Sequence, residues 1–188
     1  MSLRLGGLVA TRIERGDESG RAALQDLLER CADYMTLEDG APARPEAASD
    51  LLEALPPGRS HEQKLVLGLA RGDGGPLVAV IDVVRDFPDA KDWFVGLVLI
   101  DPAERGRGIG AAVMGDLEAW FRQEGAVASY LAVLERNPDA QGFWIRQGYQ
   151  LLDRRVRVTG TREDPVFRMR KQLQAASRRS ESRRPRAG

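Results

Sequence analysis

The residues with the clearest chemical potential are the glycines and arginines in the middle of the segment VLIDPAERGRGIGA. The segment leads from an apolar run, through a proline turn, into an amphipathic pattern typical of a helix. Gly106, Gly108 and Gly110 let the backbone approach a ligand closely, and the first turn of a helix offers unpaired N–H groups beside its positive end. Arg105 and Arg107 add permanent positive charge. The segment therefore predicts a binding site for phosphate or pyrophosphate.

The spacing of these glycines excludes two common phosphate loops. A Walker loop has the pattern G-x-x-x-x-G-K-[ST], and the dinucleotide fingerprint G-x-G-x-x-G lies within a βαβ unit. Neither pattern is present, and a series of strands precedes the glycines. The alternative interpretation is purely structural: the glycines open a helix, and both arginines are solvated.

Apolar, β-branched runs separated by turn signals indicate the strands that must position this segment. They predict strands at residues 64–70, 77–84, 93–100, 127–134, 150–158 and 166–173, with a weaker strand signal over 3–13. Apolar residues at helical spacing predict helices at 20–34, 108–124 and 138–147, and a short helix from Pro45 to before Pro56. The stretch TLEDGAPARPEAAS predicts a loop. This order predicts an α/β fold with a mixed, mostly antiparallel sheet of six or seven strands and helices on both faces.

Two motifs in this order resemble those of the GNAT superfamily of N-acetyltransferases. Residues 105–110, RGRGIG, are similar to the R-x-x-G-x-G loop that binds acyl-CoA in that family, and the preceding LIDP resembles its strand end. About thirty residues later, NPDAQGFWIRQGY matches the family segment N-x-x-A followed by G-[FY]. The resemblance covers about residues 64–152, and the first sixty residues match only loosely. It implies an acyl-CoA-dependent acetyltransferase.

The resemblance also implies where acetyl-CoA, or another acyl-CoA, binds without a metal ion. The pantetheine arm would lie along the backbone of Val98, Leu99 and Ile100 like an added strand. The pyrophosphate would be cradled by the backbone of Arg105, Gly106, Arg107, Gly108, Ile109, Gly110 and Ala111. Asn137 would line the cofactor side of the cleft. Trp144 stands where the family often has a tyrosine that protonates the CoA thiolate; since an indole is no practical acid, we expect it to pack or to contact pantetheine.

The acceptor amine must lose a proton before it can attack. Only about one amine in a few thousand with a pKa of ~10.4 is neutral at pH 7, so a base or a water relay helps. Asp92, Glu135 and Asp82 are candidate bases because they lie in or at the ends of predicted strands; the alternative is that each is a solvated carboxylate. Tyr130 lies in the middle of a strand and faces either the cleft or the opposite side.

Residues that recognise the acceptor are expected to come from the N-terminal helices and their linker. Tyr34 and Glu38 lie beside the glycine- and proline-rich stretch, which can form a lid, and acidic groups there suit a cationic amine. Trp93 follows a strand turn and either lines the acceptor pocket or packs. Cys31 lies on an apolar helix face, so we expect a buried thiol rather than an acyl carrier.

Composition limits the remaining classes of function. The chain of 188 residues has 28 basic and 28 acidic residues, one cysteine and one histidine, which excludes an internal disulfide framework and a Cys/His zinc site. No run of about 20 apolar residues indicates a membrane span, and we expect a cytoplasmic protein. Residues 175–188 hold five arginines and one glutamate and predict a disordered tail. The other residues carry a net charge of −4, which argues against nucleic-acid binding.

We therefore expect one domain over residues 1–174, with a substrate side at 1–60 and an acyl-CoA core at 61–174. The expected activity is acetyl transfer from acetyl-CoA to a primary amine, of a small molecule rather than of a protein, by direct attack within a ternary complex. Two alternatives stay open: a non-catalytic acyl-CoA-binding module, because the usual tyrosine is missing, and a protein lysine acetyltransferase. No nucleic-acid or membrane partner is expected, and a homodimer is compatible with the sequence.

Overall fold

The computed structural model describes residues 3–159 and 162–173, so the predicted tail at 175–188 lies outside the described residues. The strands within them are β1 (Arg4–Leu5), β2 (Leu8–Arg12), β3 (Lys64–Ala70), β4 (Leu77–Arg85), β5 (Asp92–Ile100), β6 (Ala128–Leu134), β7 (Gln150–Thr159) and β8 (Arg162–Gln172). The helices are α1 (Glu18–Arg30), α2 (Ala32–Asp39), α3 (Ala47–Glu53), α4 (Ile109–Gln123) and α5 (Pro138–Arg146), with a 3-10 turn at Pro102–Glu104.

All described strands join one sheet in the order β1-β2-β3-β4-β5-β6-β8-β7. Each neighbouring pair is antiparallel except β5 and β6, which run parallel. The mixed, mostly antiparallel α/β fold is therefore confirmed, with eight strands where six or seven were expected. The difference arises at the N-terminus, where Gly6 and Gly7 take positive φ angles of 59° and 79° and turn the chain into a short hairpin.

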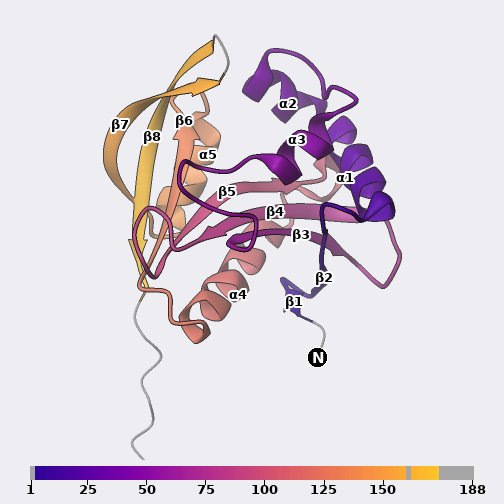
Figure 1. Ribbon diagram of the computed structural model, residues 1–188, viewed down its shortest axis with the longest axis horizontal. Helices are drawn as coiled ribbons and strands as arrows, with labels where there is room; N and C mark the ends of the chain where they lie inside the picture. Colours follow the sequence, from indigo (N-terminus) through magenta and orange to yellow (C-terminus); the bar gives the residue numbers. More distant parts are fainter. Residues whose placement is uncertain (1–2, 160–161, 174–188) are drawn as a thin grey trace, which may run out of the picture.

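Helices cover both faces of the sheet (Figure 1). Two clusters of buried apolar side chains form beneath them, one on each face. On one face the buried side of α4 packs against the sheet through Val113, Met114, Leu117 and Phe121. On the other face α1 and α3 bury the side chains Leu24, Leu27, Leu28 and Leu52 against Val66, Val80 and Leu99 of the strands. The N-terminal helices thus form a wall over the second face. β5 lies in the sheet between this wall and α4.

The sheet splits between its two parallel strands. β5 and β6 pair only from Asp92 with Ala128 to Val95 with Leu131, and they separate beyond these residues. At the same point the β4–β5 register shifts, which leaves Gly96 as an extra residue in β5. Because a bulge shifts the alternation of side chains by one position, Trp93 and Val95 face the α4 layer while Leu97 faces the α1 layer.

The predicted helix over residues 20–34 forms as two helices. Cys31 takes φ −90° and ψ 37°, which ends α1 and starts α2 in a new direction. Asp17 caps the first helix by accepting a hydrogen bond from the Gly20 amide at 2.9 Å. The predicted loop from residue 36 is wrong in its first part, because α2 continues to Asp39 and ends at Gly40 with φ 80°.

Candidate active site

The glycine-rich loop leads into α4 with its backbone exposed, as the sequence predicted. Gly106 and Gly108 have φ angles of 75° and 78°, and a Cβ atom at either would meet nothing within 4 Å. Gly108 is the N-cap of α4, and the Ala112 amide donates the first bond inside the helix, to the Gly108 carbonyl at 3.1 Å. The amides of residues 109–111 therefore have no acceptor within the helix and lie at its positive end. This geometry fits a pyrophosphate.

The two loop arginines bind carboxylates of the protein. The Arg105 Nε donates to the Ile100 carbonyl at 2.9 Å, and its Nη atoms pair with Asp33 of α2. The Arg105 guanidinium lowers the pKa of the Asp33 carboxyl. Arg107 Nη1 lies 3.1 Å from a carboxylate oxygen of Glu104. Arg105 therefore ties the loop to α2, a contact that the sequence did not indicate.

A narrow cleft of about 90 Å³ occupies the gap between the separated ends of β5 and β6. Its lining includes the predicted residues Val98, Asn137 and Trp144. Asn137 caps α5 by accepting a hydrogen bond from the Ala140 amide at 3.1 Å, and Trp144 is buried at the cleft wall. Leu99 and Ile100 continue β5 from the cleft toward the glycine-rich loop. The structure therefore brings the predicted acyl-CoA residues together along one path.

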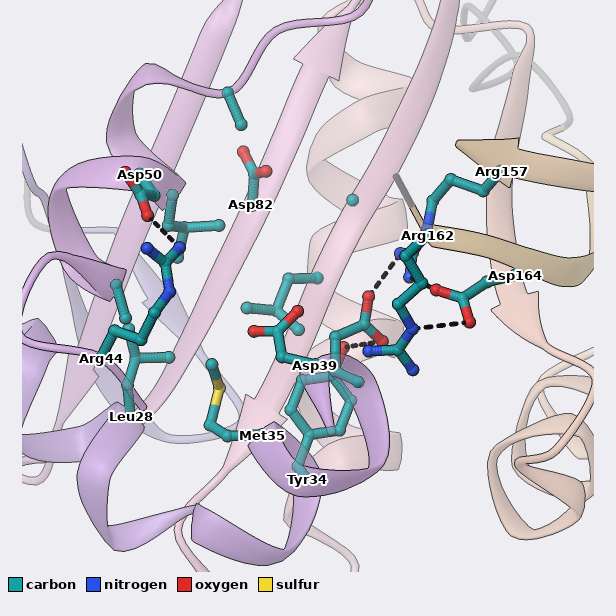
Figure 2. A pocket seen from close by; sticks show the side chains of 16 residues that line it. Leu28, Tyr34, Met35, Asp39, Arg44, Asp50, Asp82, Arg157, Arg162 and Asp164 are labelled. Carbon is teal, nitrogen blue, oxygen red and sulfur yellow. Dashed lines mark hydrogen bonds and ion pairs between the residues drawn. The ribbon is translucent and has the colours of Figure 1, made fainter. Parts of the chain in front are cut away.

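A larger cavity of about 630 Å³ lies beside the cleft, on the face covered by α1–α3. We call it the acceptor cavity (Figure 2). Its lining residues are Leu28, Tyr34, Met35, Glu38, Asp39, Arg44, Ala47, Asp50, Leu51, Ala54, Asp82, Gly96, Leu97, Arg157, Arg162 and Asp164. Arg44 and Asp50, 2.7 Å apart, form one wall, and Arg157, Arg162 and Asp164 form the opposite wall. The cavity is thus amphipathic, with apolar side chains between charged walls.

The cleft and the acceptor cavity meet at a junction of five residues that line both: Tyr34, Glu38, Gly96, Leu97 and Arg157. The Tyr34 hydroxyl donates a hydrogen bond to Glu38 Oε2 at 3.3 Å, and the other Glu38 oxygen accepts from Arg157 Nη1. Burial and the Glu38 carboxylate raise the pKa of Tyr34, whose phenol is therefore protonated at neutral pH. The two residues predicted to bind the acceptor, Tyr34 and Glu38, both lie at this junction.

Asp82 of β4 lies in the acceptor cavity directly beside Gly96. A Cβ atom on Gly96 would come within 2.8 Å of Asp82 Oδ2, so a larger residue there would force this carboxylate to shift. Asp82 is buried and accepts hydrogen bonds from the buried Lys64 Nζ at 2.8 and 2.9 Å. Burial raises the pKa of the Asp82 carboxyl, and the Lys64 ammonium opposes this shift. Of the three carboxylates proposed from the sequence, Asp82 alone lines the acceptor cavity.

The other predicted catalytic residues line neither the cleft nor the acceptor cavity. Asp92 and Tyr130 lie where β5 and β6 still pair, at the closed end of the split, and the Tyr130 hydroxyl accepts a hydrogen bond from Arg170 at 2.8 Å. Glu135 follows β6, is exposed and pairs with Arg154, which lowers the pKa of its carboxyl. The cleft opens at the end of the paired segment opposite Asp92 and Tyr130. Glu135 follows β6 at the open end, but its side chain pairs with Arg154 outside the cleft.

Trp93, predicted to line the acceptor pocket or to pack, packs. Its indole is buried on the α4 face, with ring centroids 5.3 Å from Trp120 and 4.5 Å from Phe121. Cys31 is also buried, and its Sγ lies 3.7 Å from the Ile100 carbonyl oxygen, outside both cavities. The prediction that its side chain is buried is confirmed.

Sequence reasoning missed the residues of the β7–β8 hairpin that reach the site. Arg157 Nη2 lies 3.2 Å from Asp164, and Arg136 and Arg162 also pair with that buried carboxylate. Arg136 additionally donates to the Leu37 carbonyl of α2 at 2.9 Å. The hairpin thus anchors the C-terminal end of α2 above the junction. The one local signal was the charged Arg157 inside a predicted strand, since Arg162 and Asp164 lie between the predicted strands.

The described parts of the chain lack two other kinds of feature. Residues 3–159 and 162–173 contain no group of three or more metal-binding side chains of the His, Cys, Asp or Glu type. None of the helices described is long and apolar enough to cross a membrane.

The sequence profile of the Acetyltransferase (GNAT) family matches residues 24–149. A search of curated protein sequences gave no significant match.

Solved structures share the fold at low sequence identity. An acetyltransferase from Thermus thermophilus superposes with a TM-score of 0.67 at 21% identity, covering 92% of this chain and 100% of the other. The ribosomal-protein-S18-alanine N-acetyltransferase from Escherichia coli gives 0.64 at 15% identity, covering 92% and 97%. The PaiA N-acetyltransferase from Thermoplasma acidophilum, in complex with coenzyme A, gives 0.57 at 16% identity, covering 88% and 98%.

Proposed function

Because the chain belongs to the Acetyltransferase (GNAT) family, we propose that it transfers an acetyl group from acetyl-CoA to a primary amine of a small molecule. The observation that supports this most strongly is the junction, where a cleft suited to the pantetheine arm meets a separate cavity suited to an acceptor. Two substrates in adjoining cavities can react directly. Holding the reacting groups together in this way lowers the activation free energy of the transfer by several kcal/mol.

The residues around the cleft fit acetyl-CoA, which supplies the acetyl group as an activated thioester. Backbone amides from Gly106 to Ala111 would bind the pyrophosphate, since two left-handed glycines and a helix N-terminus leave them open. The unpaired edge of β5 at Val98 offers hydrogen-bonding groups to the amides of the pantetheine arm. Asn137 and Trp144 would form the opposite wall.

Asp82 is the base that the geometry supports best. It lies in the acceptor cavity beside the junction, and its raised pKa makes it a stronger base than an exposed aspartate. Lys64 holds both of its oxygens in place. The acceptor nitrogen would give its proton to Asp82, directly or through one water molecule. Backbone N–H groups on the free side of β5 would stabilise negative charge on the acetyl oxygen.

The two facing walls of the acceptor cavity favour a small amine over a protein. α1–α3 form one side and the β7–β8 hairpin contributes the other (Figure 2). Arg157 of β7 pairs with Glu38 of α2, and Arg136, which follows β6, donates to the Leu37 carbonyl. An extended peptide would have to displace these contacts. The structural similarity to the E. coli protein named for a ribosomal-protein alanine concerns the fold alone, at 15% identity. Transfer to a protein lysine is the competing function.

A thiol-release assay tests this function. The protein is mixed with acetyl-CoA and each member of a panel of alkyl and aryl amines and lysine peptides, and free CoA is measured against protein without amine. We expect amine-dependent thiol release, with acetylated small amine recovered by mass spectrometry. Tight CoA binding without transfer to any member would instead identify a binding module. Transfer to peptides alone would identify a protein acetyltransferase.

Direct transfer without an acyl-enzyme predicts that Cys31→Ala retains wild-type activity. The Cys31 thiol is buried outside both cavities, and burial raises its pKa, so it is neither accessible nor ionised. The change removes one small buried sulfur and is expected to lower only the stability slightly. The check is the turnover number together with the intact mass after incubation with acetyl-CoA alone. An acetylated Cys31 that passes its acetyl group to an amine would contradict direct transfer.

A further inference from the structure

The junction presents one polar hydroxyl to both cavities. Of the five residues that line both, only Tyr34, Glu38 and Arg157 have polar side chains. Both Nη atoms of Arg157 already contact carboxylates, one on Glu38 and one on Asp164 at 3.2 Å. Glu38 is an acceptor, because its carboxylate pairs with this guanidinium. The Arg157 Nε has no hydrogen-bond partner, but this atom is buried. Tyr34 therefore contributes the one hydroxyl at the junction, and its donor can rotate toward a ligand.

The hydroxyl of Tyr34 is oriented but only weakly engaged. Its contact with Glu38 Oε2 measures 3.3 Å, longer than the usual 2.7–2.8 Å of an O–H···O hydrogen bond. Arg157 from β7 fixes Glu38 from the other side, and Arg136 fixes the carbonyls at the end of α2. The arrangement thus positions the ring at the junction while it leaves the O–H free to turn toward a new acceptor.

A hydrogen-bond donor at this place would assist acetyl transfer. When the C–S bond of a thioester breaks, its electron pair stays on sulfur, and the resulting negative charge lies in a partly enclosed site. A hydrogen bond from a neutral donor to a charged acceptor is stronger than one between neutral groups. Trp144 lines the cleft but does not reach the acceptor cavity, so it does not border the junction where the acetyl group passes.

We propose that Tyr34 donates a hydrogen bond to the departing sulfur of CoA, with Glu38 and Arg157 as its positioning residues. The proposal rests on the proposed acetyltransferase function. In the step, the acceptor nitrogen bonds to the acetyl carbon and its proton passes to Asp82. The C–S bond breaks, and its electron pair remains on sulfur. Tyr34 keeps its own proton throughout, consistent with the raised pKa of this buried phenol.

The direct test is the thiol pKa of bound CoA, followed by the ultraviolet absorbance of the thiolate. A donor at the sulfur stabilises the thiolate, so the pKa in the wild-type complex should lie below the ~8.5 of a free thiol. In the Tyr34→Phe complex we expect it about one unit higher than in wild type, a tenfold change in the ionisation constant. Thr36→Ala, which removes an exposed hydroxyl from the same helix outside both cavities, should match wild type.

Two further measurements separate loss of the hydrogen bond to sulfur from loss of folding. Dethio-CoA, which has no sulfur, should bind with equal affinity to all three proteins. Equal binding would show that the Tyr34→Phe protein is folded. The turnover number of Tyr34→Phe should fall about 10- to 100-fold, with the KM for acetyl-CoA nearly unchanged. An unchanged thiol pKa in a Tyr34→Phe protein that transfers at the wild-type rate would overturn the role of Tyr34 alone. Failure of wild type to bind CoA would overturn the proposed function as well.

Discussion

Replacing Asp82 by asparagine is expected to lower the turnover number by about 10²- to 10⁴-fold, because the acceptor amine loses its base. Asparagine keeps the shape of the side chain but cannot accept the proton. The KM for acetyl-CoA should stay near the wild-type value, since Asp82 lines the acceptor cavity and not the cleft. Steady-state kinetics with the best amine from the thiol-release assay would measure both constants.

The Asp82→Asn change also removes the charged partner of the buried Lys64. Because an unpaired buried ammonium destabilises the fold, a second variant must separate lost stability from lost catalysis. The double variant Lys64→Met/Asp82→Leu removes both charges together, and we expect it to fold and to be equally inactive. Asp73→Asn, a change at an exposed aspartate in the β3–β4 loop, should behave as wild type. A folded Asp82→Asn protein with wild-type turnover would contradict the assignment of the base.

The pH profile of the turnover number tests the role of Asp82 as the base in a second way. Asp82 must be ionised to accept a proton, so activity should rise as the pH increases through its pKa. Because burial raises that pKa, the acid limb should lie above the range of an ordinary aspartate. The limb should be absent from the residual activity of Asp82→Asn, and its persistence at the same pH would assign it to another group.

Replacing Gly108 by valine is expected to weaken CoA binding at least about 100-fold in calorimetry. Gly108 has φ 78° at the N-cap of α4, a conformation that a β-branched residue adopts only with strain. The backbone would shift to relieve that strain, and the amides of the first helical turn would lose their common direction toward the pyrophosphate. Several charge-assisted hydrogen bonds would weaken together.

The same helix offers a matched control for this change. Gly115 lies within α4, is exposed, and a Cβ atom there would meet nothing within 4 Å. Gly115→Ala should therefore leave CoA affinity unchanged and stabilise the helix slightly, since alanine is the better helix former. Unchanged affinity in a folded Gly108→Val protein would show that the glycine-rich loop is only a structural turn.

The acyl-CoA side of the protein could be predicted because its signals are local. The strands β3–β6 and the helices α4 and α5 follow from periodicity over short windows, and the glycine-rich loop marks its own turn and helix start. Asn137 and Val98 reach the cleft because they belong to these elements. The sequence did not indicate the partner of Arg105, because Asp33 lies 72 residues away along the chain.

The choice among candidate bases could not be made from the sequence. It depends on which end of β5 separates from β6, and strand pairing between segments more than thirty residues apart determines that. The bulge at Gly96 then decides which side chains share a face: it brings Leu97 to the acceptor side and leaves Trp93 in the core. A glycine inside an apolar strand was the available hint.

The charged wall of the acceptor cavity was equally non-local. Glu38 and Arg157 are separated by 119 residues, and their contact depends on how the β7–β8 hairpin packs against α2. Amphipathic spacing predicted a single helix and a loop in this region, whereas arginines from three distant elements fix α2 in place. Such long-range ion pairs leave no periodic pattern in a sequence.

The most direct test of the junction as the site of transfer is a crystal structure with bound CoA and an amine product. We expect the pyrophosphate within hydrogen-bonding distance of the amides of residues 106–111, the sulfur between Gly96 and the Tyr34 hydroxyl, and the acetylated amine in the acceptor cavity near Asp82. A sulfur that points away from the acceptor cavity, or an amine bound elsewhere, would contradict the account.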